Sequence, residues 1–273
     1  MTEHRVTALD GAGLAVTVAG SGPPLLLIPG LGATRVVFDP IMRLLTPRFT
    51  VAVYDQRGVG ASDLTAGPYT TAQLGDDAAA VLDGLAVDRA AVLGASFGGM
   101  VAQQLAVRHP QRVGSLLLAA TGPGRSHLVR QPEPAASAAL LGTGERTAEA
   151  AYRRACNVLY SPRFQDEHPE FIEEQVRERR LRPVAARAFQ AQLAASRSHD
   201  AWDELPSITA ATLVLHGGGD QVMPVENARV LADRIPGAAI TVFDGAGHLF
   251  FHEEPEASAA GITAFAGSAS PTR

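Results

Sequence analysis

Short apolar runs alternate with helical stretches along this chain. The run at residues 25–28 (LLLI) is fully apolar, which is typical of a strand buried on both faces of a parallel sheet. Similar runs occupy residues 50–54, 90–93, 116–119, 212–215 and 240–243. The helical stretches between them are residues 76–85, 99–108, 225–234 and 256–265. Strands that alternate with helices in this way predict an α/β fold with a mostly parallel sheet.

The start of the chain has a different pattern. Residues 6–9 and 14–18 are strand-like and flank the turn sequence DGAG at residues 10–13, so they predict an antiparallel hairpin. Together with the six apolar runs, this hairpin predicts a sheet of eight strands.

The alternation stops between residues 122 and 206. Prolines separate short helical pieces there, at Pro123, Pro132, Pro134, Pro162, Pro169 and Pro183. The segment is too rich in apolar side chains for a disordered linker. We therefore expect a helical cap at residues 122–206, inserted into a core domain made of residues 1–121 and 207–273. Within this cap, residues 175–181 (QVRERRL) carry mixed charges, which usually indicates a solvated helix face.

Composition argues against several classes of function. The chain has 273 residues, 46% of them hydrophobic, and its net charge of −5 offers no basic surface to nucleic acid. The lone cysteine, Cys156, cannot form an internal disulfide, and no apolar run is long enough to span a membrane. A cytoplasmic protein is therefore expected. Zinc-type Cys/His spacings, a Walker loop and a dinucleotide-binding glycine motif are missing, so no metal or organic cofactor is expected.

The sequence GASFGG at residues 94–99 lies between an apolar strand and a helical stretch. A G-x-S-x-G pattern in this context predicts a nucleophile elbow, a tight turn that lifts the Ser96 hydroxyl above the sheet. Any side chain at Gly94 or Gly98 would clash in such a turn. The turn also leaves backbone N–H groups free at the start of the following helix, where they can hold an anion.

A serine hydroxyl needs a general base before it can attack a carbonyl carbon. His248 is the favoured base, because the sequence GAG at residues 245–247 lets a short loop project the imidazole over the strand ends. Other histidines fit less well. His252 precedes EEP and suggests a helix start at the surface, His216 is expected to pack or to cap a turn, and His109 ends a helix before a proline.

The base in turn needs a carboxylate that orients its ring. Asp220 fits this role, because it follows an apolar strand and the flexible turn GGG at residues 217–219. Alternatively, Asp220 could be an ordinary turn residue before the helix at residues 225–234. Asp244 is the main rival, since it ends the next strand and is close to His248 in the sequence.

Two backbone N–H groups are candidates for an oxyanion hole. The N–H of Phe97 belongs to the start of the helix beside Ser96, and the N–H of Leu31 belongs to the loop PGLG that follows the strand at residues 25–28. Two such donors stabilise a tetrahedral oxyanion. On its own, the PGLG loop would be typical of an ordinary turn.

The sequence DQRGVGAS at residues 55–62 follows another predicted strand. Such a segment could serve as a binding motif. The more strongly favoured interpretation is that Asp55 and Arg57 belong to a structural network that braces the PGLG loop.

Four features occur together: the chain order Ser96, Asp220, His248, the elbow, the GLG loop at residues 30–32 and the DQRGVGAS segment. With this combination the chain resembles the α/β-hydrolase family over nearly its whole length. The resemblance implies the α/β-hydrolase fold, with helices on both faces of an eight-stranded sheet and an inserted cap. Within the family the chain is similar to small bacterial esterases and lactonases of the 3-oxoadipate enol-lactonase-like group. Pro29 stands where many relatives have a histidine, but the oxyanion role of the backbone after Gly30 is expected to survive.

The resemblance implies a serine hydrolase that cleaves a carboxylic ester or a lactone with apolar character. Ser96 would be the nucleophile, His248 the base and Asp220 the orienting acid, while the N–H groups of Leu31 and Phe97 would hold the oxyanion. A serine nucleophile argues against dehalogenase and epoxide hydrolase chemistry. Two alternatives stay open: the same triad could act as a base in C–C cleavage or cyclisation, or the fold could bind a ligand without turnover. No nucleic-acid or membrane partner is expected, and the pattern does not indicate an oligomeric state.

Overall fold

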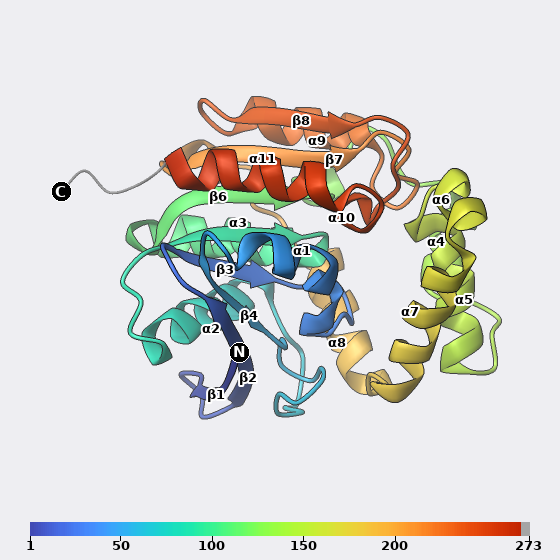
Figure 1. Cartoon of the computed structure of the whole chain (residues 1–273), viewed down its shortest axis with the longest axis horizontal. Coiled ribbons are helices and arrows are strands. Elements are labelled where there is room, and N and C mark those ends of the chain that lie inside the picture. Colours follow the sequence, from blue (N-terminus) through green and yellow to red (C-terminus); the bar gives the residue numbers. More distant parts are fainter. Residues whose placement is uncertain (269–273) are drawn as a thin grey trace.

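One sheet of eight strands forms the centre of the structure, a computed structural model that describes residues 1–268 (Figure 1). The strands are β1 (Thr2–Thr7), β2 (Gly13–Gly20), β3 (Pro24–Ile28), β4 (Thr50–Tyr54), β5 (Ala90–Ala95), β6 (Val113–Ala119), β7 (Ala211–Gly217) and β8 (Ala239–Phe243). Residues 269–273, which the sequence assigned to the end of the core domain, lie outside the described residues.

The order of the strands across the sheet is β1-β2-β4-β3-β5-β6-β7-β8. The pairs β1–β2 and β2–β4 are antiparallel, and every other neighbouring pair is parallel. The mostly parallel eight-stranded sheet with an antiparallel start is therefore confirmed. All six strands from β3 onward run in one direction, so their carboxyl ends meet at the same edge of the sheet.

Helices cover both faces of the sheet, as expected. They are α1 (Asp39–Leu45), α2 (Thr71–Gly84), α3 (Phe97–Arg108), α9 (Val225–Arg234), α10 (Phe250–Glu253) and α11 (Pro255–Ser268). Alternate residues of β3 show the two layers: Leu26 and Ile28 belong to the apolar cluster that contains α2, α3 and α9, whereas Leu25 and Leu27 belong to the cluster that contains α1 and α11. This two-sided burial is the reason why the central strands are continuously apolar.

Residues 122–206 contain five further helices, α4 (Pro134–Leu140), α5 (Ala148–Leu159), α6 (Pro162–Glu167), α7 (Pro169–Leu181) and α8 (Ala186–Ser198). We call residues 122–206 the cap segment. Figure 1 shows α4 to α7 gathered to one side of the sheet, beyond the carboxyl ends of the strands. The helical content matches the expectation, while the division of the chain into two domains at these residues stays a prediction.

Two expectations about the sheet are wrong in detail. The run at residues 240–243 becomes β8 at the edge of the sheet, where Ile240 is 38% exposed, so it is not buried on both faces. The first strand covers Thr2–Thr7 rather than residues 6–9, because the edge strand β1 buries only Val6 and so carries little apolar signal. Among residues 1–268, no helix has the length and apolar character needed to cross a membrane.

Candidate active site

Ser96 lies at the sharp turn between β5 and α3. Its backbone has φ 55° and ψ −119°, a conformation that costs energy for a residue with a side chain and that often marks functional sites. A Cβ at Gly94 would come within 2.2 Å of the Gly98 carbonyl oxygen, and one at Gly98 within 2.1 Å of the Ile28 carbonyl oxygen. The expected clash at both glycines is thus confirmed. Glycine at these two positions lets α3 start directly beside β3 and β5.

His248 and Asp220 form a hydrogen-bonded pair. The Nδ1–H of His248 donates to Oδ2 of Asp220 over 2.7 Å, and both side chains are almost completely buried. The other oxygen of Asp220, Oδ1, accepts from the backbone N–H groups of Val222 and Met223, each at 2.8 Å. Three hydrogen bonds therefore fix the carboxylate, which in turn fixes the orientation of the imidazole.

A second histidine contacts the same carboxylate. His216 is fully buried, and its Nε2 lies 3.2 Å from Oδ2 of Asp220 and 2.7 Å from the carbonyl oxygen of Met223. Burial by itself would raise the pKa of Asp220, but the charges and hydrogen bonds of His248 and His216 hold that pKa well below its usual value of 3.8. The carboxylate is therefore ionised at neutral pH. The expectation that His216 packs at the end of its strand is consistent with this position.

Glycines bring the acid and histidine loops into contact. A Cβ at Gly217 would come within 2.0 Å of the carbonyl oxygen of Gly247, so the two backbones touch. The N–H of Gly218 donates to the carbonyl of Phe243 at 2.8 Å, and the N–H of Gly219 donates to that of Ala246 at 2.9 Å. This close approach sets Asp220 next to His248, although 28 positions separate them along the chain.

The rival residues lie elsewhere. Asp244 is exposed and makes no ion pair with any residue that the structure describes. His252 is buried rather than at the surface, which corrects the expectation: its Nε2–H donates to the Val37 carbonyl at 2.6 Å, and its Nδ1 accepts from the Tyr160 hydroxyl at 3.0 Å. His109 ends α3 and contacts Asp76 at 2.7 Å.

Leu31 and Phe97, whose N–H groups are the proposed oxyanion donors, both line the cavity that Ser96 also lines. Within residues 1–268 neither group donates a hydrogen bond to the protein. Gly30 lies close to the elbow, since a Cβ there would come within 3.9 Å of the Ser96 hydroxyl oxygen. The loop and the start of α3 therefore offer two unused donors near the serine.

The network around residues 55–62 contacts the PGLG loop through Gln56, and not through the side chains of Asp55 and Arg57 that were expected to brace it. Asp55 accepts from the backbone N–H of Arg35 at 2.8 Å and also pairs with the Arg35 side chain. The amide of Gln56 donates to the Pro29 carbonyl at 2.6 Å. Arg57 is buried and pairs with Asp77 of α2 and, over 2.7 Å, with Asp10 in the turn between β1 and β2, so it links those two segments rather than bracing the PGLG loop.

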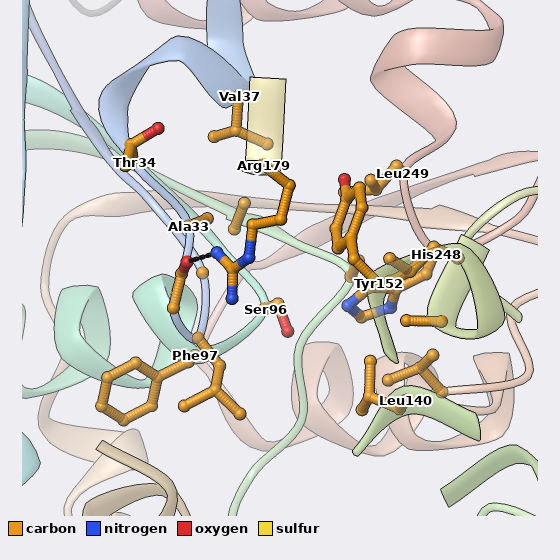
Figure 2. A pocket seen from close by; sticks show the side chains of 18 of the residues that line it. Ala33, Thr34, Val37, Ser96, Phe97, Leu140, Tyr152, Arg179, His248 and Leu249 are labelled. Carbon is orange, nitrogen blue, oxygen red and sulfur yellow. Dashed lines mark hydrogen bonds between the residues drawn. The ribbon is translucent and has the colours of Figure 1, made fainter. Parts of the chain in front are cut away.

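A cavity of about 290 Å³ lies between the sheet edge and the cap segment (Figure 2). Ser96 and His248 open into it from the core. The cap segment contributes a mostly apolar wall, which includes Leu140, Leu141, Tyr152, Leu159, Phe189 and Leu193. Among the described residues, no cluster of His, Cys, Asp or Glu side chains has the arrangement of a metal site.

Sequence reasoning missed three residues that hold this site. Gln192 accepts from the Gly32 N–H at 2.8 Å, and Arg179 donates to the Gly32 carbonyl oxygen, so the cap segment holds both polar groups of that loop residue. Glu253 accepts from the Gly247 N–H at 3.0 Å beside His248. No local motif marks any of them. Arg179 lies in the charged stretch 175–181, whose interpretation as a solvated face is wrong at this residue.

A model of the alpha/beta hydrolase fold family matches residues 23–255. The chain belongs to the alpha/beta hydrolase fold family. The resemblance noted from the sequence is confirmed, and with it the eight-stranded hydrolase fold.

This alpha/beta hydrolase has relatives among esterases and lactonases. It is 31% identical to the poly(3-hydroxyalkanoate) depolymerase of Ectopseudomonas oleovorans, over 96% of this chain and 91% of that protein. It is 28% identical to 3-oxoadipate enol-lactonase 2 of Acinetobacter baylyi, over 93% and 94% of the two chains. The solved structure of Est816, an N-acyl homoserine lactone degrading enzyme, has a TM-score of 0.80 and 30% identity over 96% of this chain and 100% of that chain.

Proposed function

We propose that the protein hydrolyses a carboxylic ester or a lactone through an acyl-enzyme on Ser96. The observation that carries this proposal is the buried 2.7 Å hydrogen bond between His248 and Asp220, at a cavity that Ser96 also lines. In the first step His248 takes the proton of the Ser96 hydroxyl, whose oxygen attacks the carbonyl carbon. The ionised Asp220 stabilises the imidazolium that forms.

The tetrahedral oxyanion accepts hydrogen bonds from the N–H groups of Leu31 and Phe97 in this proposal. Each donor of this kind typically contributes about 3 kcal/mol to transition-state stabilisation. His248 then protonates the leaving alcohol oxygen, and the acyl group stays on Ser96. In the second half, His248 takes a proton from water, which attacks the acyl carbon and releases the acid.

The substrate is proposed to have apolar character and to be selected by the cap segment. The leucine and phenylalanine side chains on the cap wall of the cavity support this, since apolar surface favours apolar substrate groups. The relatives point to the same bond type: one is named as a depolymerase of a polyester, and two are named for lactones.

Labelling with a fluorophosphonate tests the proposal. The reagent is expected to modify Ser96 in the wild type, and labelling is expected to be lost in Ser96→Ala and strongly slowed in His248→Ala. Mass spectrometry of the digested protein locates the modified residue. His4→Gln, a change at an exposed residue of β1, is the matched control for a histidine substitution. Modification of a residue other than Ser96, or unchanged labelling of His248→Ala, contradicts the proposal.

A further inference from the structure

Arg179 brings a positive charge into the cavity. Its side chain reaches from α7 into the space above Ser96 and lines the cavity together with His248 (Figure 2). One guanidinium N–H donates to the Gly32 carbonyl oxygen, and the guanidinium carbon lies 5.6 Å from the centre of the Tyr152 ring. Among residues 1–268, no carboxylate lies within ion-pair distance of this guanidinium.

The other charges on the same wall neutralise each other. Glu178 on α7 and Arg182, the residue directly after α7, both line the cavity and form an ion pair. Arg179 is therefore the cavity-lining cation that keeps its charge uncompensated within the described part of the chain. Burial lowers the pKa of Arg179 from its usual value of 12.5, which shows that the surroundings disfavour the cation.

An uncompensated guanidinium in a partly apolar cavity is costly unless an anion binds to it. Five N–H donors point from a guanidinium in a planar fork, and the Gly32 carbonyl uses one of them. The remaining donors suit the two oxygens of a carboxylate, which guanidinium groups bind in a bidentate manner. A single arginine neutralises a carboxylate completely, whereas a phosphate dianion would keep one charge.

The position of Arg179 also indicates which part of a substrate it meets. Gly32, to which it is bonded, follows Leu31 directly in the loop that carries a proposed oxyanion donor. Figure 2 shows the Arg179 guanidinium and His248 on opposite sides of Ser96. In the proposed mechanism, His248 protonates the leaving alcohol, so the alcohol lies on the histidine side. The acyl part then lies on the side of Arg179.

We propose that Arg179 binds a carboxylate at the far end of the acyl part, so that the preferred substrates are esters or lactones of dicarboxylic acids. This proposal rests on the proposed hydrolase function and adds a substrate class to it. The apolar cap wall would hold the methylene chain between the scissile carbonyl and the carboxylate.

A matched substrate series tests the proposal. The 4-nitrophenyl half-esters of dicarboxylic acids from glutarate to suberate are compared with the same esters whose free carboxylate is methylated. The wild type is expected to show at least about a 10-fold higher kcat/KM for the half-ester at one chain length or more, because hydrogen bonds between charged groups are stronger than those to a neutral ester. Arg179→Met is expected to lose this preference, and Arg179→Lys to regain part of it through its charge.

The matched control is Arg180→Met. Arg180 is the next residue on α7, is exposed, and has no ion pair among the described residues. It is expected to keep the preference for the half-ester. Arg179→Met also loses its bond to Gly32, so both substrates will slow; the ratio of their kcat/KM values is the readout that separates anion binding from loop support.

Several outcomes overturn the proposal. The first two are an equal fold-decrease of kcat/KM on both esters in Arg179→Met and a loss of the half-ester preference in Arg180→Met. The others are a preference only for esters with an anionic alcohol, and faster hydrolysis of an ester whose acyl chain ends in a phosphonate than of one that ends in a carboxylate. Calorimetry with Ser96→Ala gives an answer that needs no turnover: the intact half-ester should bind at least about 10-fold more tightly than its methyl ester. If the wild type hydrolyses neither ester while this binding difference persists, the hydrolase proposal fails and the anion site stands.

Discussion

The carboxyl edge of the sheet and the cap segment build opposite walls of one cavity by different means. At the sheet edge, each proposed catalytic group lies beyond the carboxyl end of a strand and beside glycines: Ser96 after β5, Asp220 after β7 and His248 after β8. In the cap segment, short helices separated by prolines supply apolar side chains and Arg179 without any repeated pattern.

This contrast shows two kinds of structural constraint. A tight turn beside a parallel strand imposes glycine at particular positions, such as Gly94 and Gly98, because a Cβ would overlap backbone atoms. A helix that lines a cavity constrains only the size and the polarity of the side chains that face the cavity. Chemistry is therefore expected to depend on the sheet edge, and substrate choice on the cap segment.

The largest effect on activity is expected for Asp220, the proposed acid at the sheet edge. Asp220→Asn should lower kcat by about 10⁴-fold with little change in KM, because an amide no longer stabilises the imidazolium or its tautomer. Initial rates with a neutral aryl ester measure this change. Asp244→Asn is the matched control and should stay within about twofold of the wild type. The reverse order of the two variants would move the acid role to Asp244.

The junction between the sheet edge and the cap segment is expected to weaken in acid. His199 in the cap segment bonds to Thr71 and Gln103 of the core, and His252 in the core bonds to Tyr160 of the cap segment. Burial lowers the pKa of both His199 and His252 from 6.5 to about 4. Below pH 6.5 the unfolded chain therefore takes up protons that the folded protein does not, so stability falls as the pH drops toward 4.

The expected loss approaches about 1.4 kcal/mol per pH unit for each histidine below pH 6, or roughly 3–4 kcal/mol in total between pH 7 and pH 5. Urea denaturation at pH 7 and at pH 5 measures it. His199→Gln should remove about half of this pH dependence, whereas the exposed His4→Gln should remove none. A free energy of unfolding that is equal at the two pH values would show that these imidazoles are not held neutral.

A smaller effect on activity is expected for Glu253, which links the cap segment to the histidine loop at the sheet edge. Its carboxylate accepts from the Ser161 N–H at 2.8 Å, from the Ser161 hydroxyl at 2.6 Å and from the Gly247 N–H beside His248. Glu253→Gln replaces one acceptor by an amide nitrogen, so the histidine loop should loosen and kcat/KM should fall about 10-fold. Glu254→Gln, which changes only a surface pair with Arg163, is the control. Equal effects of the two variants would reject the positioning role of Glu253.

The smallest effect on activity is expected for substitutions of apolar side chains with which the cap segment lines the cavity. Leu140→Ala should raise KM for esters of longer acyl chains about fivefold and leave kcat within about twofold, because it removes apolar contact without touching the reacting groups. Steady-state kinetics over a series of acyl chain lengths measures it. Leu181→Ala on α7 is the control, since that side chain is 63% exposed. A fall in kcat for Leu140→Ala would place the cap segment within the chemistry.

Much of the sheet edge could be predicted from the chain alone. Five consecutive residues with two obligatory glycines identify the turn at Ser96, and apolar runs followed by short glycine-rich loops identify the positions of Asp220 and His248. These signals are local, because sterics at a turn and burial of a strand act on neighbouring residues. The sequence favoured Asp220 over Asp244 only by its place after a strand and a glycine turn. The contact of the two glycine loops supports that order, because it buries Asp220 against His248 and leaves Asp244 exposed.

The sequence by itself therefore determined the hydrolase fold, its strand order along the chain and the candidate catalytic groups. The tertiary structure decided that Arg179, a member of a charge-rich helix, faces a cavity without a counter-charge, and that His252 is buried behind the site. It also decided that β8 lies at the edge of the sheet. The physical reason is that burial and charge compensation depend on which distant segments pack together. The residues next to a position in the sequence do not determine that packing.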